Sequence, residues 1–126
     1  MRQARRFRGA LRMRATMPGG EIELIVANRI WLRLIGLMRL GPADLKPILF
    51  PRCGSLHTFW MRTPIDIVWL EMTEDGATVR AVREALPPRR TARGGRGASA
   101  LELAPGAAGA LGLVPGIALS LASIAP

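Results

Sequence analysis

The sequence predicts a mainly β protein: a compact two-sheet sandwich or small barrel with two short helices. Short apolar segments rich in aromatic and β-branched residues recur along the chain, and turn signals such as Glu74-Asp75-Gly76 separate them. The length of 126 residues suits one domain with a modest core. The apolar fraction of 49% argues against intrinsic disorder.

The first part of the chain is predicted to contain an arm, a strand and a helix. Residues 1–19 hold six arginines and no acid, so we interpret them as a basic flexible arm, with a single β-rich domain over residues 20–126. EIELIVAN, residues 21–28, alternates with apolar side chains on one face and predicts a strand. NRIWLRLIGLMRL, residues 28–40, has apolar residues at helical spacing, and Asn28 can cap this helix.

The rest of the chain is predicted to form short strands and one further helix. The expected strands are PILF (47–50), SLHTFWM (55–61), IDIVWLEM (65–72), ATVRAVREAL (77–86), SALEL (99–103) and the end of PGIALSL (115–121). The second and third of these are predicted to pair as a hairpin that turns at residues 62–64. Residues 87–98 are predicted to be a loop, and residues 105–113 a short helix that starts near Pro105.

The formal charge of +9 raises the question of a nucleic-acid partner. Residues 21–79 are nearly neutral, with six bases and seven acids, so the excess lies on the arm and on residues 80–96. We interpret most of this charge as solvated, since arginine predominates throughout the chain and an Arg-rich composition is typical of a GC-rich genome. A weak nucleic-acid binder that uses the arm and the 87–98 loop is the alternative, and its binding would weaken steeply with salt.

The sequence predicts neither a signal peptide nor a membrane span. No apolar run follows the N-terminal arginines, and the uncharged residues 103–126 are interrupted by repeated Pro and Gly. The single cysteine cannot form an internal disulfide, which fits a reducing compartment. We therefore expect a cytoplasmic protein.

One stretch, CGSLHTFWMRTPIDIVWL from Cys53 to Leu70, holds the only cysteine and the only histidine. Cys53, His57 and Met61 are four residues apart and are plausible soft-metal ligands. In a strand, four residues span about 13 Å. We therefore expect these side chains to share one face without sharing a metal ion or forming a Cys–His nucleophile. No catalytic residue, metal ligand or cofactor is predicted.

Asp66 is the polar residue that stands out, because it lies between two isoleucines in an apolar strand. One interpretation is that it accepts backbone N–H bonds and caps the neighbouring turn. The other is that it edges a small pocket with His57, Trp60 and Arg62, and that Arg39 joins the rim. Either way, a buried carboxylate requires partners.

Five motifs occur in an order that resembles the domain-of-unknown-function family 192. They are GLM (36–38), ILF (48–50), TFWM (58–61), PIDIVWL (64–70) and LELAPGAAGALGLVPG (101–116). The resemblance covers residues 21–122 and implies a compact, mainly β fold with short helices, without implying an activity. Many members of that family carry an N-terminal signal or anchor. This chain has Ile117 where members often have an acid, and Pro47 where they usually have glycine.

Taken together, the residues favour an uncharacterised β-domain that is a non-enzymatic binding or accessory protein. It would hold a small ligand or a protein partner at the candidate pocket. A hydrolase-like enzyme that uses His57 and Asp66 is an alternative, and it requires the two side chains to meet in an open cleft. The oligomeric state is left open by the sequence.

Overall fold

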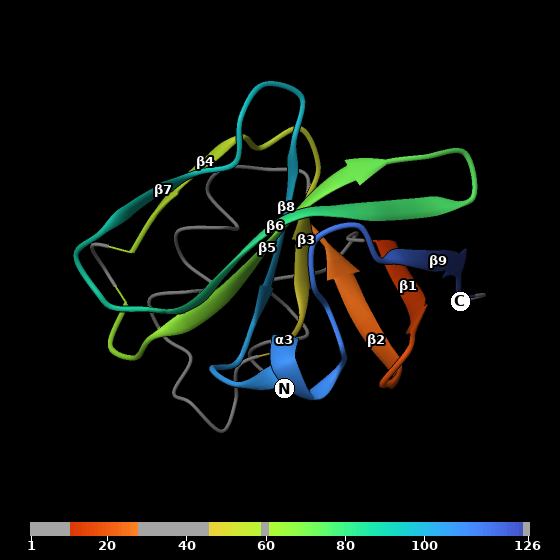
Figure 1. The fold of residues 1–126 in the computed structure, drawn as a ribbon, viewed down its shortest axis with the longest axis horizontal. Coiled ribbons are helices and arrows are strands. Elements are labelled where there is room, and N and C mark those ends of the chain that lie inside the picture. The colour runs from red at the N-terminus through yellow and green to blue at the C-terminus, as the bar shows by residue number, and fades with distance from the viewer. Residues whose placement is uncertain (1–10, 28–45, 59–60, 125–126) are drawn as a thin grey trace.

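The structure is a computed structural model that describes residues 11–27, 46–58 and 61–124. Its main body is a closed barrel with strand order β1-β2-β3-β8-β5-β6-β9, and β4 and β7 form a separate two-stranded sheet (Figure 1). The barrel strands are β1 (Leu11–Met17), β2 (Gly20–Val26), β3 (Ile48–Phe50), β5 (Ile65–Met72), β6 (Gly76–Leu86), β8 (Ser99–Leu103) and β9 (Ala118–Ser123). The predicted mainly β class is confirmed, and the architecture is the barrel.

Helices contribute little to the part of the chain that the structure describes. α3 (Ala107–Ala110) is a single turn within the predicted 105–113 segment. The predicted helix at residues 28–40 lies outside the described residues. No helix in the described ranges has the length and apolar character needed to cross a membrane.

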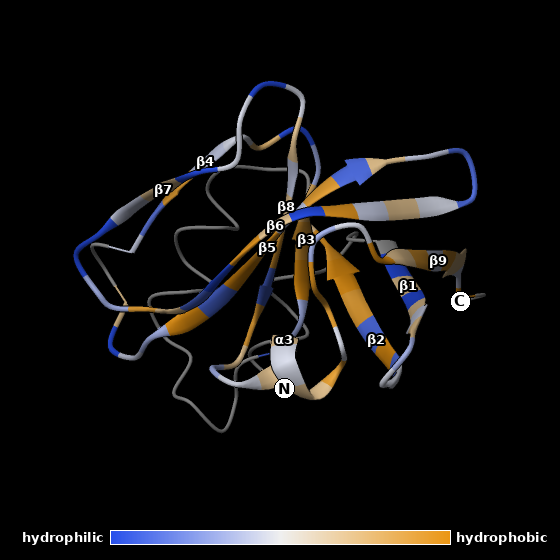
Figure 2. Ribbon diagram, viewed as in Figure 1, coloured by the Kyte–Doolittle hydropathy of each residue, from blue (hydrophilic) through white to orange (hydrophobic). Residues whose placement is uncertain are grey.

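The barrel interior forms one hydrophobic cluster, which we call the inner core. Strands β5 and β8 contribute Val68, Leu70, Leu101 and Leu103, all at most 1% exposed. Ala108 of α3 packs into the same cluster. Because successive strand residues point to opposite faces, alternate residues of β5 supply this core and the others face outward. Figure 2 shows the resulting apolar strands in orange.

A second cluster, the outer core, lies on the other face of β3, β8 and β5. It contains Ile67 and Trp69 of β5 and Ala100 of β8, together with Leu56 of β4. The sheet formed by β4 (Ser55–His57) and β7 (Thr91–Arg93) packs against it, with Ala92 also in contact. β5 is therefore buried on both faces over residues 65–70, which explains its almost continuous apolar sequence.

The predicted hairpin between SLHTFWM and IDIVWLEM is wrong. β5 pairs with β6 on one edge and with β8 on the other. A strand has only two edges, so none remains for β4, which pairs with β7 instead. β7 in turn lies within residues 87–98, so the predicted loop contains a strand.

The predicted arm at residues 1–19 is also wrong over β1, which pairs with β2 and with β9 and so closes the barrel. Ala15 and Met17 point inward and are buried, whereas Arg12 and Arg14 are exposed. Apolar side chains recur at every second residue of β1, as expected for a strand. The sequence interpretation overlooked this pattern because arginines dominate the composition of residues 1–19. Closure leaves the barrel without an unpaired edge strand. Residues 1–10 lie outside the described part of the chain.

Gly94 allows the loop after β7 to lie directly on the buried indole of Trp69. A Cβ atom at this position would overlap the ring carbons Cδ2 and Cε3. The guanidinium of Arg80 holds the same loop, because its Nη1 donates to the carbonyls of Gly94 at 3.0 Å and Arg96 at 3.2 Å. The loop is thus fixed to β5 and β6 by packing and by hydrogen bonds.

We expect Gly94→Ala to lower the free energy of unfolding by about 1–3 kcal/mol, because the added methyl group must displace the Trp69 ring. Gly109→Ala is the matched control, since its Cβ would meet only Glu84 Oε1, at 3.7 Å, and alanine favours the helix. Urea denaturation of both variants measures the difference. Equal stability of the two variants would contradict the proposed packing.

Candidate functional site

The carboxylate of Asp66 lies at one end of the barrel and is fully buried, with 0% exposure. Its Oδ1 accepts a hydrogen bond from the Ala85 amide at 2.8 Å. Its Oδ2 accepts two more, from the amides of Gly106 and Ala108, both at 3.0 Å. Three backbone donors thus compensate the loss of hydration that burial imposes on a carboxylate.

Local irregularities of the backbone bring these three amides to one point. Opposite Asp66, the β5–β6 register shifts so that two residues of β6 face one of β5, which is a β-bulge. Ala85 in this bulge has φ 47°. Gly106 has φ 90° and precedes α3, and as a glycine it offers no side chain to cap the helix. The carboxylate of β5 supplies that cap from 40 residues away.

Asp66 therefore accepts hydrogen bonds from backbone N–H groups, as one sequence interpretation expected, but these groups belong to other segments than the expected turn. Its partners belong to the β6 bulge and the start of α3, not to the turn at residues 62–64.

His57 and Arg62 are the two other predicted pocket residues that the structure describes, and neither donates a hydrogen bond to Asp66. His57 is exposed on β4, and Arg62 is exposed in the bend before β5. Trp60 and Arg39 lie outside the described residues. All the hydrogen bonds recorded for Asp66 come from backbone amides, so its carboxylate is not paired with the His57 ring.

The expectation that Cys53, His57 and Met61 share one face is wrong. Cys53 and Met61 are buried in the outer core, whereas His57 faces solvent. The Cys53 thiol donates to the Ser55 carbonyl at 3.2 Å. Within the described ranges, no group of three or more His, Cys, Asp or Glu side chains could hold a metal ion.

Glu102 of β8 is a second buried acid, 1% exposed, and the sequence interpretation missed it. It lies between Ile48 of β3 and Ile67 of β5 in the register of the sheet. The signal that singled out Asp66, an acid within an apolar strand, is also present in SALEL.

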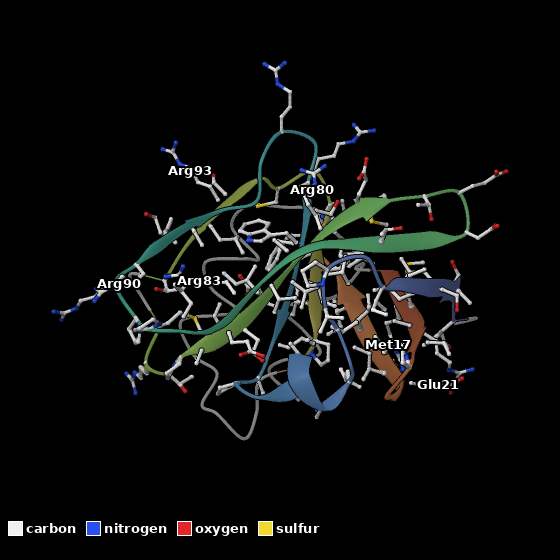
Figure 3. The ribbon with its side chains drawn as sticks, viewed as in Figure 1. Met17, Glu21, Arg80, Arg83, Arg90 and Arg93 are labelled. Atoms are coloured by element: carbon white, nitrogen blue, oxygen red, sulfur yellow. The ribbon has the colours of Figure 1, made fainter. Side chains whose placement is uncertain are left out.

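Five exposed arginines lie near the end of β6 and on the segment that links β6 to β8, and we call them the arginine face. They are Arg83, Arg89, Arg90, Arg93 and Arg96. Figure 3 shows that Arg90 and Arg93 extend outward on the side of the molecule where β7 lies. Within residues 76–98 the sequence contains one acid, Glu84. The region is thus strongly cationic.

Thr58 fixes the turn that presents these arginines. Its side chain is 1% exposed, donates to the Pro87 carbonyl at 2.7 Å and accepts from the Arg90 amide at 2.9 Å. Its backbone N–H donates to the Arg90 carbonyl at 2.8 Å, and its carbonyl accepts from the Arg89 amide at 2.9 Å. Four hydrogen bonds from one buried residue therefore order the start of β7.

The outward face of the β4–β7 sheet adds further polar side chains to the arginine face. Ser55 lies opposite Arg93 and His57 lies opposite Thr91, and all four side chains are exposed. The intervening Leu56 and Ala92 point inward to the outer core. His57 therefore belongs to the same surface as Arg93.

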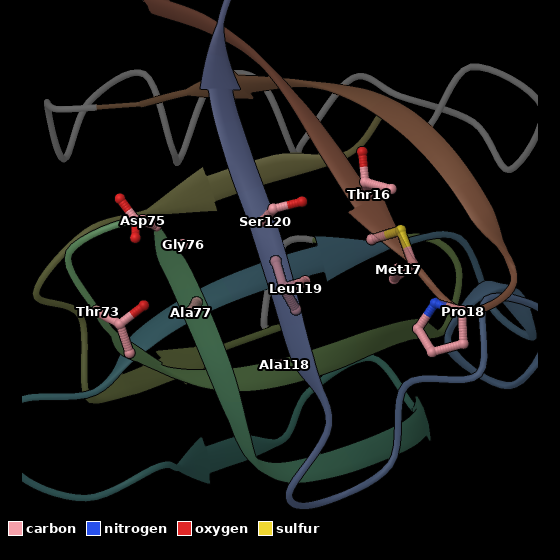
Figure 4. Close-up of a pocket in the computed structure, with 10 residues that line it drawn as sticks. All are labelled: Thr16, Met17, Pro18, Thr73, Asp75, Gly76, Ala77, Ala118, Leu119 and Ser120. Atoms are coloured by element: carbon pink, nitrogen blue, oxygen red, sulfur yellow. The ribbon is translucent and has the colours of Figure 1, made fainter.

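A shallow groove of about 440 Å³ crosses β9 elsewhere on the barrel (Figure 4). Strand β9 lies between Thr16 and Pro18 on one side and Thr73 and Asp75 on the other. Asp75 is the single charged residue among those that line the groove, and the lining contains no histidine or cysteine. The groove thus lacks a pair of groups for general acid–base chemistry.

Comparisons with known proteins agree on the fold and give no activity. The family model for DUF192, described as "Uncharacterized ACR", matches residues 12–121. A protein of unknown function from Novosphingobium aromaticivorans is 20% identical, with a TM-score of 0.64 over 88% of this chain and 84% of that one. A candidate transcription regulator from Sinorhizobium meliloti is 24% identical, with a TM-score of 0.66 over 90% and 93%. No curated protein gives a significant match.

We expect Asp66→Ala to lower the free energy of unfolding by about 3 kcal/mol, because the two part-buried amides of Ala85 and Gly106 and the buried amide of Ala108 all lose their acceptor. Asp66→Asn keeps one acceptor oxygen and should cost less. The exposed Asp75→Asn serves as control and should change stability by less than about 0.5 kcal/mol. Hydrogen exchange should also accelerate at the Gly106 and Ala108 amides in Asp66→Ala. Protection equal to that of the wild type would contradict the capping role.

Proposed function

Since the chain belongs to the DUF192 family, whose function is unknown, we propose from its own surface that it is a non-enzymatic domain that binds an anionic partner through the arginine face. The two solved structures share the fold of this chain but are less than 25% identical to it in sequence, and a shared fold alone does not indicate a shared partner.

The separation of charge on the surface is the observation that carries this proposal. The arginine face contains five exposed bases near one exposed acid, Glu84. Glu71, Glu74 and Asp75 are exposed instead at the β5–β6 turn, which projects on the opposite side of the molecule from β7 (Figure 1). A one-signed surface attracts a partner of opposite charge and accelerates its association.

The fixed backbone of this surface also favours binding. Thr58 orders the turn before β7, and Arg80 with Gly94 orders the loop after it. Ordering a loop upon binding costs free energy, and a loop ordered beforehand avoids most of that cost. The Arg80 guanidinium is engaged within the protein and acts as a support for the face.

The site geometry supports binding better than hydrolysis. The hydrolase alternative needs His57 beside a carboxylate in an open cleft, whereas the Asp66 carboxylate is fully buried and both its oxygens accept hydrogen bonds from backbone amides. His57 and Arg62, both exposed, remain candidate contact residues, now beside the arginines. A contact role for Trp60 and Arg39 remains a prediction.

We expect the full chain to bind heparin, a sulfated polyanion, and Arg89→Gln/Arg90→Gln/Arg93→Gln to weaken this binding about tenfold. That factor corresponds to three exposed charge contacts of about 0.5 kcal/mol each. Arg12→Gln/Arg14→Gln/Lys46→Gln removes the same charge from two exposed positions of β1 and from an exposed position two residues before β3. Isothermal titration calorimetry at moderate salt compares the variants. If both triple variants lost the same heparin affinity, the net charge alone would explain the binding, and the proposal would be overturned.

A further inference from the structure

We propose that the anionic partner is a nucleic-acid duplex, held by its phosphate backbone without readout of base sequence. This inference rests on the proposed function and specifies its partner. Arginine alone does not select the partner, because 17 of the 18 basic residues in the chain are arginine. The choice of a duplex as the partner depends on two observations from the described part of the chain. These are the polar side chains that accompany the arginines and the burial of the aromatic side chains.

The accompanying groups are typical of phosphate contacts. Arginine can donate two parallel N–H bonds to one phosphate. Ser55 and Thr91 expose hydroxyl groups, and His57 exposes a ring, on the same face as Arg93. Arginine and hydroxyl side chains are among the groups that donate hydrogen bonds to phosphate and sugar in DNA complexes. An acidic protein would offer carboxylates at irregular positions, whereas a duplex offers a regular array of charges.

Within residues 11–27, 46–58 and 61–124, no exposed phenylalanine or tryptophan accompanies the arginines. Single-strand binders stack bases on aromatic rings in a basic groove. The aromatic residues in the described ranges are Phe50 and Trp69, which are 3% and 2% exposed and lie in the outer core. The chain contains no tyrosine. The arginine face as described therefore offers charge and hydrogen bonds without a stacking platform, which suits stacked and paired bases better than free ones.

The dimensions of the face limit the contact to a few phosphates. Arg89 lies in a bend with φ 63°, so the chain from Arg89 to Arg93 spans at most about 13 Å, and one strand of a duplex carries a charge every 3.4 Å of axis. About three to five phosphates can therefore be reached. The acidic β5–β6 turn, with Glu71, Glu74 and Asp75, would repel the backbone, so the duplex should approach from the β7 side.

Fluorescence anisotropy with a labelled 20-base-pair duplex tests the inference on the full chain. We expect two duplexes of unrelated sequence to bind equally well and more tightly than either single strand. The slope of log K against log salt should lie between about −3 and −5, at 0.9 per phosphate. Arg89→Gln/Arg90→Gln/Arg93→Gln should flatten this slope by about 3, whereas Arg12→Gln/Arg14→Gln/Lys46→Gln should leave it within about 1.

The heparin titration separates the two proposals. Binding of heparin without binding of the duplex would overturn the duplex assignment and leave the anionic partner in place. Failure to bind either ligand would overturn both. Tighter binding of single strands, a tenfold preference between the two duplex sequences, or equal competition by poly-glutamate would each overturn the assignment to a duplex backbone.

Discussion

The fold depends on one buried carboxylate. Asp66 joins three separate parts of the chain, because it lies on β5 and accepts hydrogen bonds from the β6 bulge and from the start of α3. The residue at the start of α3 is Gly106, which has no side chain to cap the helix, so the Asp66 carboxylate supplies the cap. The three backbone amides replace the water that would hydrate the Asp66 carboxylate, which lowers the cost of burying its charge. In turn, the carboxylate is the hydrogen-bond acceptor for these amides. Each side of this interaction makes the other possible.

The same strand organises the surface. β5 is covered on its inner face by the barrel core and on its outer face by the β4–β7 sheet, so both faces and both edges are occupied. The outer cover brings Trp69 against Gly94, and this contact together with Thr58 fixes the connection that carries the arginines. The display of charge is therefore a consequence of packing on β5 and does not require a flexible tail.

Acids and bases have different roles in this protein. Asp66 and Glu102 are buried within the sheet, whereas the arginine face and the acidic β5–β6 turn are exposed on separate parts of the surface. A positive net charge spread evenly would mainly keep the chain soluble, but its concentration on one ordered connection creates a local field that can attract an anion. The position of the positive charge on the surface therefore matters more for binding than the net charge of +9.

The sequence by itself determined where several strands run and that two of them are mostly apolar. IDIVWLEM and SALEL coincide with β5 and β8, because apolar runs between turn signals report burial directly. It also singled out Asp66 as a polar residue that required partners. Tertiary structure alone decided the identity of those partners, the pairing of β4 with β7 and the role of β1. Pairing joins segments far apart in the chain, and no local pattern states which strand edge is already occupied.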